Sequence, residues 1–181
     1  MDNKLIDSFS NTIDTWITEL EHYSFPELTA TPFTGGWSMG QLYMHLILET
    51  NFYIEQIHSC ISSNANAAQP LGARARELFI INSFPDEKIE GPPSNAFVPQ
   101  PGSKQQLVQA LGNVKAAMNA AAVAISASQF HGKTQHPGFN YLTAAEWLQL
   151  ADIHLRHHLR QKKRLDANRH QRDADGTNQY E

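Results

Sequence analysis

Apolar side chains recur at intervals of three and four residues in four separate stretches of this chain, and that spacing places them on one face of an α-helix. The stretches cover about residues 3–22, 39–63, 104–127 and 143–166. Each stretch is apolar on one face only, and such helices bury their apolar faces best by packing together as a bundle. The pattern therefore predicts an all-α fold, a four-helix bundle, and it indicates no strand.

Three of the four predicted helices begin at a capping box, in which a Ser or Thr accepts from the third helical amide and a Gln or Glu returns to the capping residue. The boxes are Ser38–Gln41, Ser103–Gln106 and Thr143–Glu146. A further short helical piece is predicted at 71–81. The connection over residues 82–102 is long and rich in proline. A loop of this length usually crosses the body of a domain, so the second and third long helices are not expected to be hairpin neighbours.

Composition limits the class of protein. The chain has 181 residues, of which 41% are hydrophobic, and a formal net charge of -4. This length suits one domain, expected over residues 1–167, followed by a polar and flexible tail at 168–181. No run approaches the roughly 18 apolar residues of a membrane span, and no secretory signal pattern is present. The single cysteine, Cys60, fits a reducing cytoplasm. Basic residues gather only at the end of the last helix, so nucleic acid is not an expected partner.

Histidines stand on the inward faces of two predicted helices. His154 and His158 are four residues apart in the last helix and share its apolar stripe, whereas His157 lies at the edge of that stripe. His45 lies in the middle of the stripe of the second helix. Buried imidazoles need partners. A metal ion is one such partner, and three neutral imidazoles leave a fourth position open for water or substrate. The alternative is that carbonyl or carboxylate groups satisfy these histidines.

The order and spacing of these residues resemble a known family. The run Trp37-Ser38-x-x-Gln41-x-x-x-His45, followed far downstream by His154-x-x-x-His158-x-x-Gln161, is similar to the DinB/YfiT-like superfamily over about residues 3–166. The resemblance implies up-down-down-up connectivity. It also implies a divalent metal ion, zinc or nickel ahead of iron, held by the three histidines. Relatives include S-transferases that use bacillithiol or mycothiol, a maleylpyruvate isomerase and metal-dependent hydrolases.

The chemistry expected of such a site follows from the metal. A three-histidine zinc ion can lower the pKa of bound water to about 7 or bind a thiol as the thiolate. Cys60 lies about four turns from His45 along the same helix, and we interpret it as a packing residue. A thiol would therefore have to come from a cosubstrate. Glu49, one turn from His45, is a candidate general base or partner of a ligand, and a surface ion pair is the alternative. Gln161 could bond a ligand histidine or a substrate, or cap the end of the stripe.

Two functions follow. The first is a metal-dependent enzyme acting on a small molecule, most readily a thiol S-transferase of the bacillithiol type or a related hydrolase. The second is a non-enzymatic, stress-linked bundle or small-molecule-binding module whose metal is absent or vestigial, because no residue besides the histidines has an unambiguous chemical role. An apolar outer face would suit a homodimer, although the sequence assigns no such face.

Overall fold

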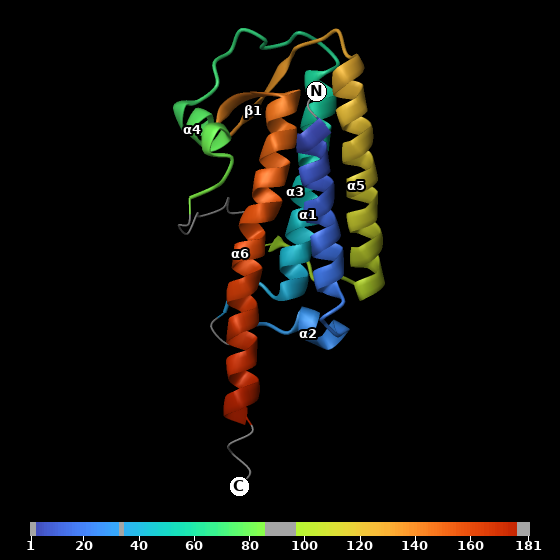
Figure 1. The fold of residues 1–181 in the computed structure, drawn as a ribbon, viewed down its shortest axis with the longest axis vertical. Coiled ribbons are helices and arrows are strands. Elements are labelled where there is room, and N and C mark those ends of the chain that lie inside the picture. The colour runs from blue at the N-terminus through green and yellow to red at the C-terminus, as the bar shows by residue number, and fades with distance from the viewer. Residues whose placement is uncertain (1–2, 33–34, 86–96, 177–181) are drawn as a thin grey trace.

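The computed structural model describes residues 3–32, 35–85 and 97–176, with side chains as far as residue 166. Four long helices lie side by side along one axis (Figure 1). They are α1 (Asn3–Leu20), α3 (Met39–Cys60), α5 (Lys104–Ala127) and α6 (Ala144–Gly176). α1 and α3 each pack against both α5 and α6. The prediction of a mostly helical fold is therefore confirmed, with helices close to the expected positions.

The helices are held together by the stripes that the sequence shows. In α1 the side chains of Phe9, Ile13, Trp16 and Leu20 are fully buried, and they belong to one hydrophobic core shared by all four long helices. Burying a side chain of this size contributes about 1.5–3 kcal/mol relative to leaving it in water. The polar tip of Trp16 is satisfied as well, because its indole N–H donates to the carbonyl of Leu155 in α6 at 3.3 Å.

Two of the three predicted capping boxes form in full. Ser38 accepts from the amide of Gln41 while the Gln41 side chain returns to the Ser38 amide, and Thr143 and Glu146 form the matching pair before α6. At α5 the prediction is half wrong. Ser103 accepts from the Gln106 amide, but the Gln106 side chain accepts instead from the amide of Gly102.

The prediction that the chain has no strand is wrong. β1 (Lys133–His136) and β2 (Asn140–Thr143) form an antiparallel hairpin with Thr134 opposite Leu142, directly before α6. Tertiary contacts stabilise it, because Leu142 is fully buried and the Trp147 indole donates to the Thr134 hydroxyl at 2.7 Å. Strands this short carry too few residues for a clear alternating pattern.

Two shorter helices complete the described fold. α4 (Ala73–Ile81) lies within the predicted range 71–81. α2 (Phe25–Thr29) is a five-residue helix that the sequence analysis did not predict, and it begins at a capping box between Ser24 and Glu27 with proline in its first turn. That box is the signal that could have predicted it.

The C-terminal end of the fold can be compared with the prediction only in part. α6 continues to Gly176, beyond the end near residue 166 that apolar periodicity indicates. The flexible tail expected at 168–181 stays a prediction, since the side chains there lie outside the described residues. No helix in the described ranges is long and apolar enough to cross a membrane.

The long connection between α4 and α5 is described at both ends, while its middle, residues 86–96, lies outside the described residues. The second end is fastened to the start of α3, where the Gln41 side chain donates to the Val98 carbonyl at 2.7 Å. Gly40 permits this approach, because a Cβ there would lie 2.9 Å from the Pro101 ring and from the Leu28 carbonyl. This fastening lies about one turn of α3 before His45.

Candidate metal centre

Three histidines from two helices converge on one point in the bundle. The Nε2 atom of His45 on α3 lies 3.2 Å from the Nε2 atoms of both His154 and His158 on α6. The Nε2 atoms of His154 and His158 lie 3.0 Å apart. The spacing of four residues on α6 and the contact between α3 and α6 together produce this triangle. Among the described residues this is the group of ligand atoms close enough to hold a metal ion, and it contains no carboxylate.

Burial keeps these imidazoles neutral. His45 is 5% exposed and His158 is 7% exposed. Desolvation lowers the pKa of His45 to about 4 and that of His158 to about 3, and burial also holds the pKa of His154 well below its usual range. Neutral imidazoles have lone pairs available at neutral pH, which is the form that binds metal ions.

Hydrogen bonding cannot satisfy all three close contacts of the triangle. The His158 Nδ1 atom lies 2.6 Å from the Gln161 Oε1 atom. That oxygen only accepts, so Nδ1 carries the proton and the His158 Nε2 atom presents a lone pair. If one of the other two Nε2 atoms carries a proton, the remaining bare nitrogen faces His158 lone pair to lone pair. If both carry protons, the two N–H groups face each other. Each arrangement leaves at least one repulsive contact.

A cation at the centre removes this conflict, since it would accept all three lone pairs. Ligand nitrogens at about 2.0–2.1 Å from a tetrahedral zinc ion lie about 3.3 Å from one another. The observed separations of 3.0–3.2 Å are close to that value. Three imidazoles also match the ligand preference of zinc, nickel, copper and iron. The donor set therefore fits a divalent metal ion with one or more open positions.

The contacts around the three histidines are unequal. Gln161 holds His158 in the tautomer that exposes Nε2. The Trp37 ring covers His45, with centroids 4.7 Å apart. The buried Nδ1 atom of His154 has no hydrogen-bond partner among the described residues, although the Tyr53 ring lies edge-on to that imidazole at 5.8 Å. Metal-binding histidines usually donate their second N–H to an oxygen, and Gln161 gives His158 this support.

The structure brings together the three histidines that the sequence selected. His157, at the edge of the stripe, contributes no atom to the triangle, and its Nδ1 atom accepts from Arg160 at 3.0 Å. Gln161 bonds a cluster histidine, which is one of the roles expected of it. Cys60 is buried and its thiol contacts the Leu142 carbonyl at 3.5 Å, which suits a packing residue.

Glu49 is not one of the residues that form the triangle. It is half-buried on α3, one turn beyond His45. Burial raises the pKa of the Glu49 carboxyl, while a hydrogen bond from the Tyr53 hydroxyl acts in the opposite direction. The pairing with Tyr53 was not expected from the sequence. The spacing of four residues on one helix is the signal that could have indicated it.

Comparison with known proteins identifies one relationship. A family model described as the DinB superfamily matches residues 8–161, which includes all three cluster histidines and ends at Gln161. A search of curated proteins and a search of solved structures each found no match.

Proposed function

Because this chain belongs to the DinB superfamily, we propose that it is a metal-dependent enzyme in which His45, His154 and His158 hold one divalent metal ion. The observation that supports this most strongly is the triangle of Nε2 atoms, which hydrogen bonds alone cannot satisfy. The same membership supports up-down-down-up connectivity for the four long helices. Zinc or nickel is proposed ahead of iron.

The residues around the ion would prepare it for chemistry. Bound there, a divalent ion would supply Lewis acidity that lowers the pKa of a coordinated water or thiol. Gln161 fixes the His158 tautomer, so that its lone pair faces the centre. Desolvation keeps the imidazoles unprotonated. Glu49 is the proposed proton acceptor, because burial raises the pKa of its carboxyl toward the range useful at neutral pH.

The proposed reaction is transfer to or from a low-molecular-weight thiol, ahead of hydrolysis. The one thiol of the chain is not available at the site, because Cys60 is buried against the hairpin and burial raises the pKa of its thiol. A thiolate is the reactive form in S-transfer, so the thiol is proposed to come from a cosubstrate. The single cysteine also supports a cytoplasmic setting.

The decisive experiment is metal analysis of tag-free protein by plasma mass spectrometry, beside two variants. His154→Ala removes one corner of the triangle, whereas His58→Ala removes an exposed histidine from α3. We expect about one metal ion per chain in the wild type and in His58→Ala, and little in His154→Ala. A site with three protein ligands loses most of its metal affinity when one of them is removed. Circular dichroism shows whether His154→Ala stays helical.

The alternative hypothesis is that the protein is a non-enzymatic binding module. It would be favoured if wild-type protein holds little zinc or nickel even after reconstitution, or if metal content is unchanged in His154→Ala. Metal occupancy together with turnover that depends on an added thiol would exclude it.

A further inference from the structure

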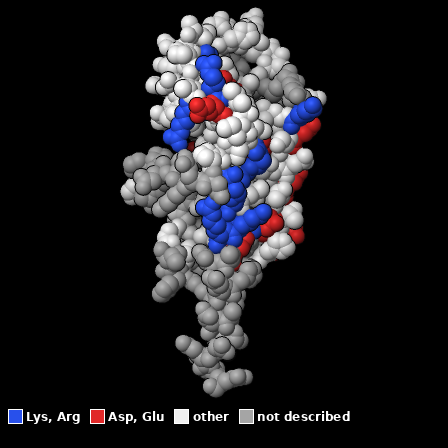
Figure 2. Space-filling view, turned by 60° about the vertical axis from the view of Figure 1, so that its left-hand side comes forward, with Lys and Arg blue, Asp and Glu red and all other residues white. Residues whose placement is uncertain are grey.

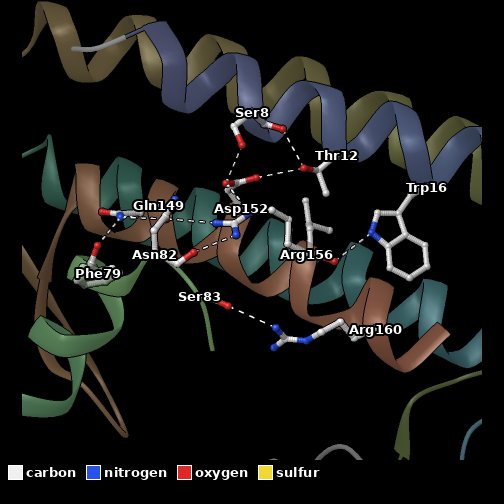
Figure 3. A network of polar contacts seen from close by, with 11 residues as sticks. Ser8, Thr12, Trp16, Phe79, Asn82, Ser83, Gln149, Asp152, Arg156 and Arg160 are labelled. Carbon is white, nitrogen blue, oxygen red and sulfur yellow. Dashed lines mark hydrogen bonds and ion pairs between the residues drawn. The ribbon is translucent and has the colours of Figure 1, made fainter. Parts of the chain in front are cut away.

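The end of α4 is held against α6 by two arginines one turn apart. Arg156 donates from Nη1 to the Asn82 carbonyl at 2.9 Å and from Nη2 to the Asn82 side-chain oxygen at 3.2 Å. Arg160 donates from Nη2 to the Phe84 carbonyl at 2.9 Å and lies 3.4 Å from the Ser83 hydroxyl. The two guanidinium groups thus hold residues 82–84, which we call the α4 exit segment. Figure 3 shows their contacts with Asn82 and Ser83.

The first arginine is itself fixed from inside the bundle. Asp152 is 1% exposed, and its Oδ2 atom accepts from the Arg156 Nε at 3.1 Å and from the Ser8 hydroxyl at 3.0 Å. Its Oδ1 atom accepts from the Thr12 hydroxyl at 3.2 Å. Two hydroxyls of α1 therefore fix the orientation of the Asp152 carboxylate, which in turn fixes the orientation of the Arg156 guanidinium. Figure 3 shows these side chains converging between α1 and α6. A geometry determined this fully is preorganised.

The second arginine connects the α4 exit segment to the histidine cluster. The same Nη2 group that donates to the Phe84 carbonyl lies 3.0 Å from the His157 Nδ1 atom. A guanidinium only donates, so His157 accepts at Nδ1. The Phe84 ring lies edge-on to His157, with centroids 5.2 Å apart, and His157 lies edge-on to His158 at 5.2 Å. One guanidinium thus positions the His157 ring beside a cluster histidine, and the Phe84 ring beside His157.

Phe84 belongs to a closed circuit of rings around the α6 side of the cluster. It stacks on Phe139 at 6.3 Å, and that ring stacks on His136 at 4.5 Å. His136 lies 5.4 Å from Trp147, which reaches Tyr53 and so returns to the cluster at His154. Beyond the circuit, Phe52 on α3 is 39% exposed and packs edge-on to Trp147. The cluster is therefore flanked by aromatic side chains, some of which reach solvent.

A basic surface on α6 offers a different kind of recognition. The exposed side of α6 carries Lys163 and Arg164 beyond Arg156 and Arg160, and Figure 2 shows Lys and Arg gathered in a stripe there. Such a stripe would favour an anionic group. Arg156 and Arg160, however, direct their N–H groups at the carbonyls of the α4 exit segment. These two arginines thus bind the chain itself, and the aromatic side chains are the better candidates for substrate contact.

We propose that Phe84, placed by Arg156 and Arg160, is a specificity-determining residue that gives the histidine site a preference for thiols with an apolar, ring-bearing body. This inference rests on the proposed function, since it needs a metal ion that binds the thiol. Sites for small molecules are lined mainly by apolar and aromatic side chains, with few polar groups that fix orientation. Offset and edge-on contacts between rings add to the stabilisation from area burial alone.

The test uses full-length protein loaded with cobalt(II), whose visible absorption reports the metal and a bound thiolate without any turnover. Phenylmethanethiol and ethanethiol serve as probes, because both are alkyl thiols and only one carries a ring. We expect wild-type protein to bind phenylmethanethiol about tenfold more tightly. Phe84→Ala should reduce this preference to within about twofold at unchanged cobalt affinity, while Phe84→Tyr keeps it.

The arginine variants test whether Phe84 acts on thiol binding or only on folding. Arg160→Met should lower the preference as Phe84→Ala does, and the double variant should lower it no further, because both changes act on one contact. Lys163→Met, which removes an exposed charge from the same helix, should keep the wild-type preference. Additive losses in the double variant would overturn the link between the arginine and the ring.

The outcomes separate the two proposals. If wild-type protein binds no cobalt, or binds it without any spectral change on adding thiol, the proposed function fails and this inference fails with it. If cobalt and thiols bind but wild-type protein shows no preference, or Phe84→Ala keeps the preference, only this inference is overturned.

Discussion

Replacing Gln161 by leucine should weaken metal binding through His158 without touching the metal site itself. The Gln161 Oε1 atom accepts from the His158 Nδ1–H at 2.6 Å, and His158 is 7% exposed. Leucine keeps much of the volume but cannot accept. The variant therefore removes one hydrogen bond from one ligand and leaves all three histidines in place.

The magnitude follows from which state bears the loss. With a metal ion bound, the His158 Nε2 lone pair is committed and the proton must stay at Nδ1, where leucine leaves it buried and unpaired. Such a group costs about 1–3 kcal/mol. Without the metal ion the proton can move to Nε2, which lies 3.0 Å from His154 and 3.2 Å from His45. The penalty then falls on the metal-bound state alone, and affinity should fall by about 5- to 150-fold.

Competition with a chromophoric chelator measures this change for zinc and for nickel at neutral pH. Gln161→Glu is the matched positive control, because a carboxylate also accepts from Nδ1–H and should retain at least wild-type affinity. Gln109→Leu makes the same chemical change at an exposed position on α5 and should have no effect. Thermal unfolding of the metal-free proteins shows whether the fold is intact.

An affinity of Gln161→Leu within about twofold of wild type would refute the reasoning, because it would mean that the hydrogen bond does not govern the His158 tautomer. Equal losses in Gln161→Leu and Gln161→Glu would also refute it, since they would trace the effect to shape rather than to an acceptor.

Two further predictions concern stability in the metal-free protein. Burial lowers the pKa of His136 to about 4, so the unfolded chain binds more protons below pH 6.5, and stability is full above that value and lost as pH falls toward 4. Between pH 7.5 and pH 5 the free energy of unfolding, measured in urea, should therefore fall by about 1–2 kcal/mol more in the wild type than in His136→Asn. Asparagine keeps an acceptor for the Gly138 amide. Equal losses in the two proteins would contradict the assigned cause. Asp152→Ala leaves Arg156 and two hydroxyls without their shared acceptor, and it should cost about 2–3 kcal/mol because Arg156 is partly exposed. Asp14→Ala, which breaks an exposed pair with Lys115, should cost under about 1 kcal/mol, and a similar cost for the two would count against the role given to burial.

The local features of this protein could be predicted from its sequence. Helix positions follow from apolar spacing and helix starts from capping residues, and both depend on neighbours within a few positions. The inward direction of His45, His154 and His158 follows from the same periodicity, so the cluster could be proposed before any contact was known. The resemblance to the DinB superfamily uses that spacing too, and the family match over residues 8–161 confirms it.

Only the tertiary structure decided how distant segments satisfy one another. The hairpin forms because Leu142 is buried and the Trp147 indole donates to the Thr134 hydroxyl. The Gln106 side chain accepts from the Gly102 amide rather than from the Ser103 amide. The choice of His158 over His157 depends on Gln161 on one side and Arg160 on the other. The placement of Phe84 depends on a chain of contacts that begins at Ser8 and Thr12. Periodicity indicates which face a residue occupies, but the partner on that face comes from another part of the chain, and its geometry is fixed only when the helices pack.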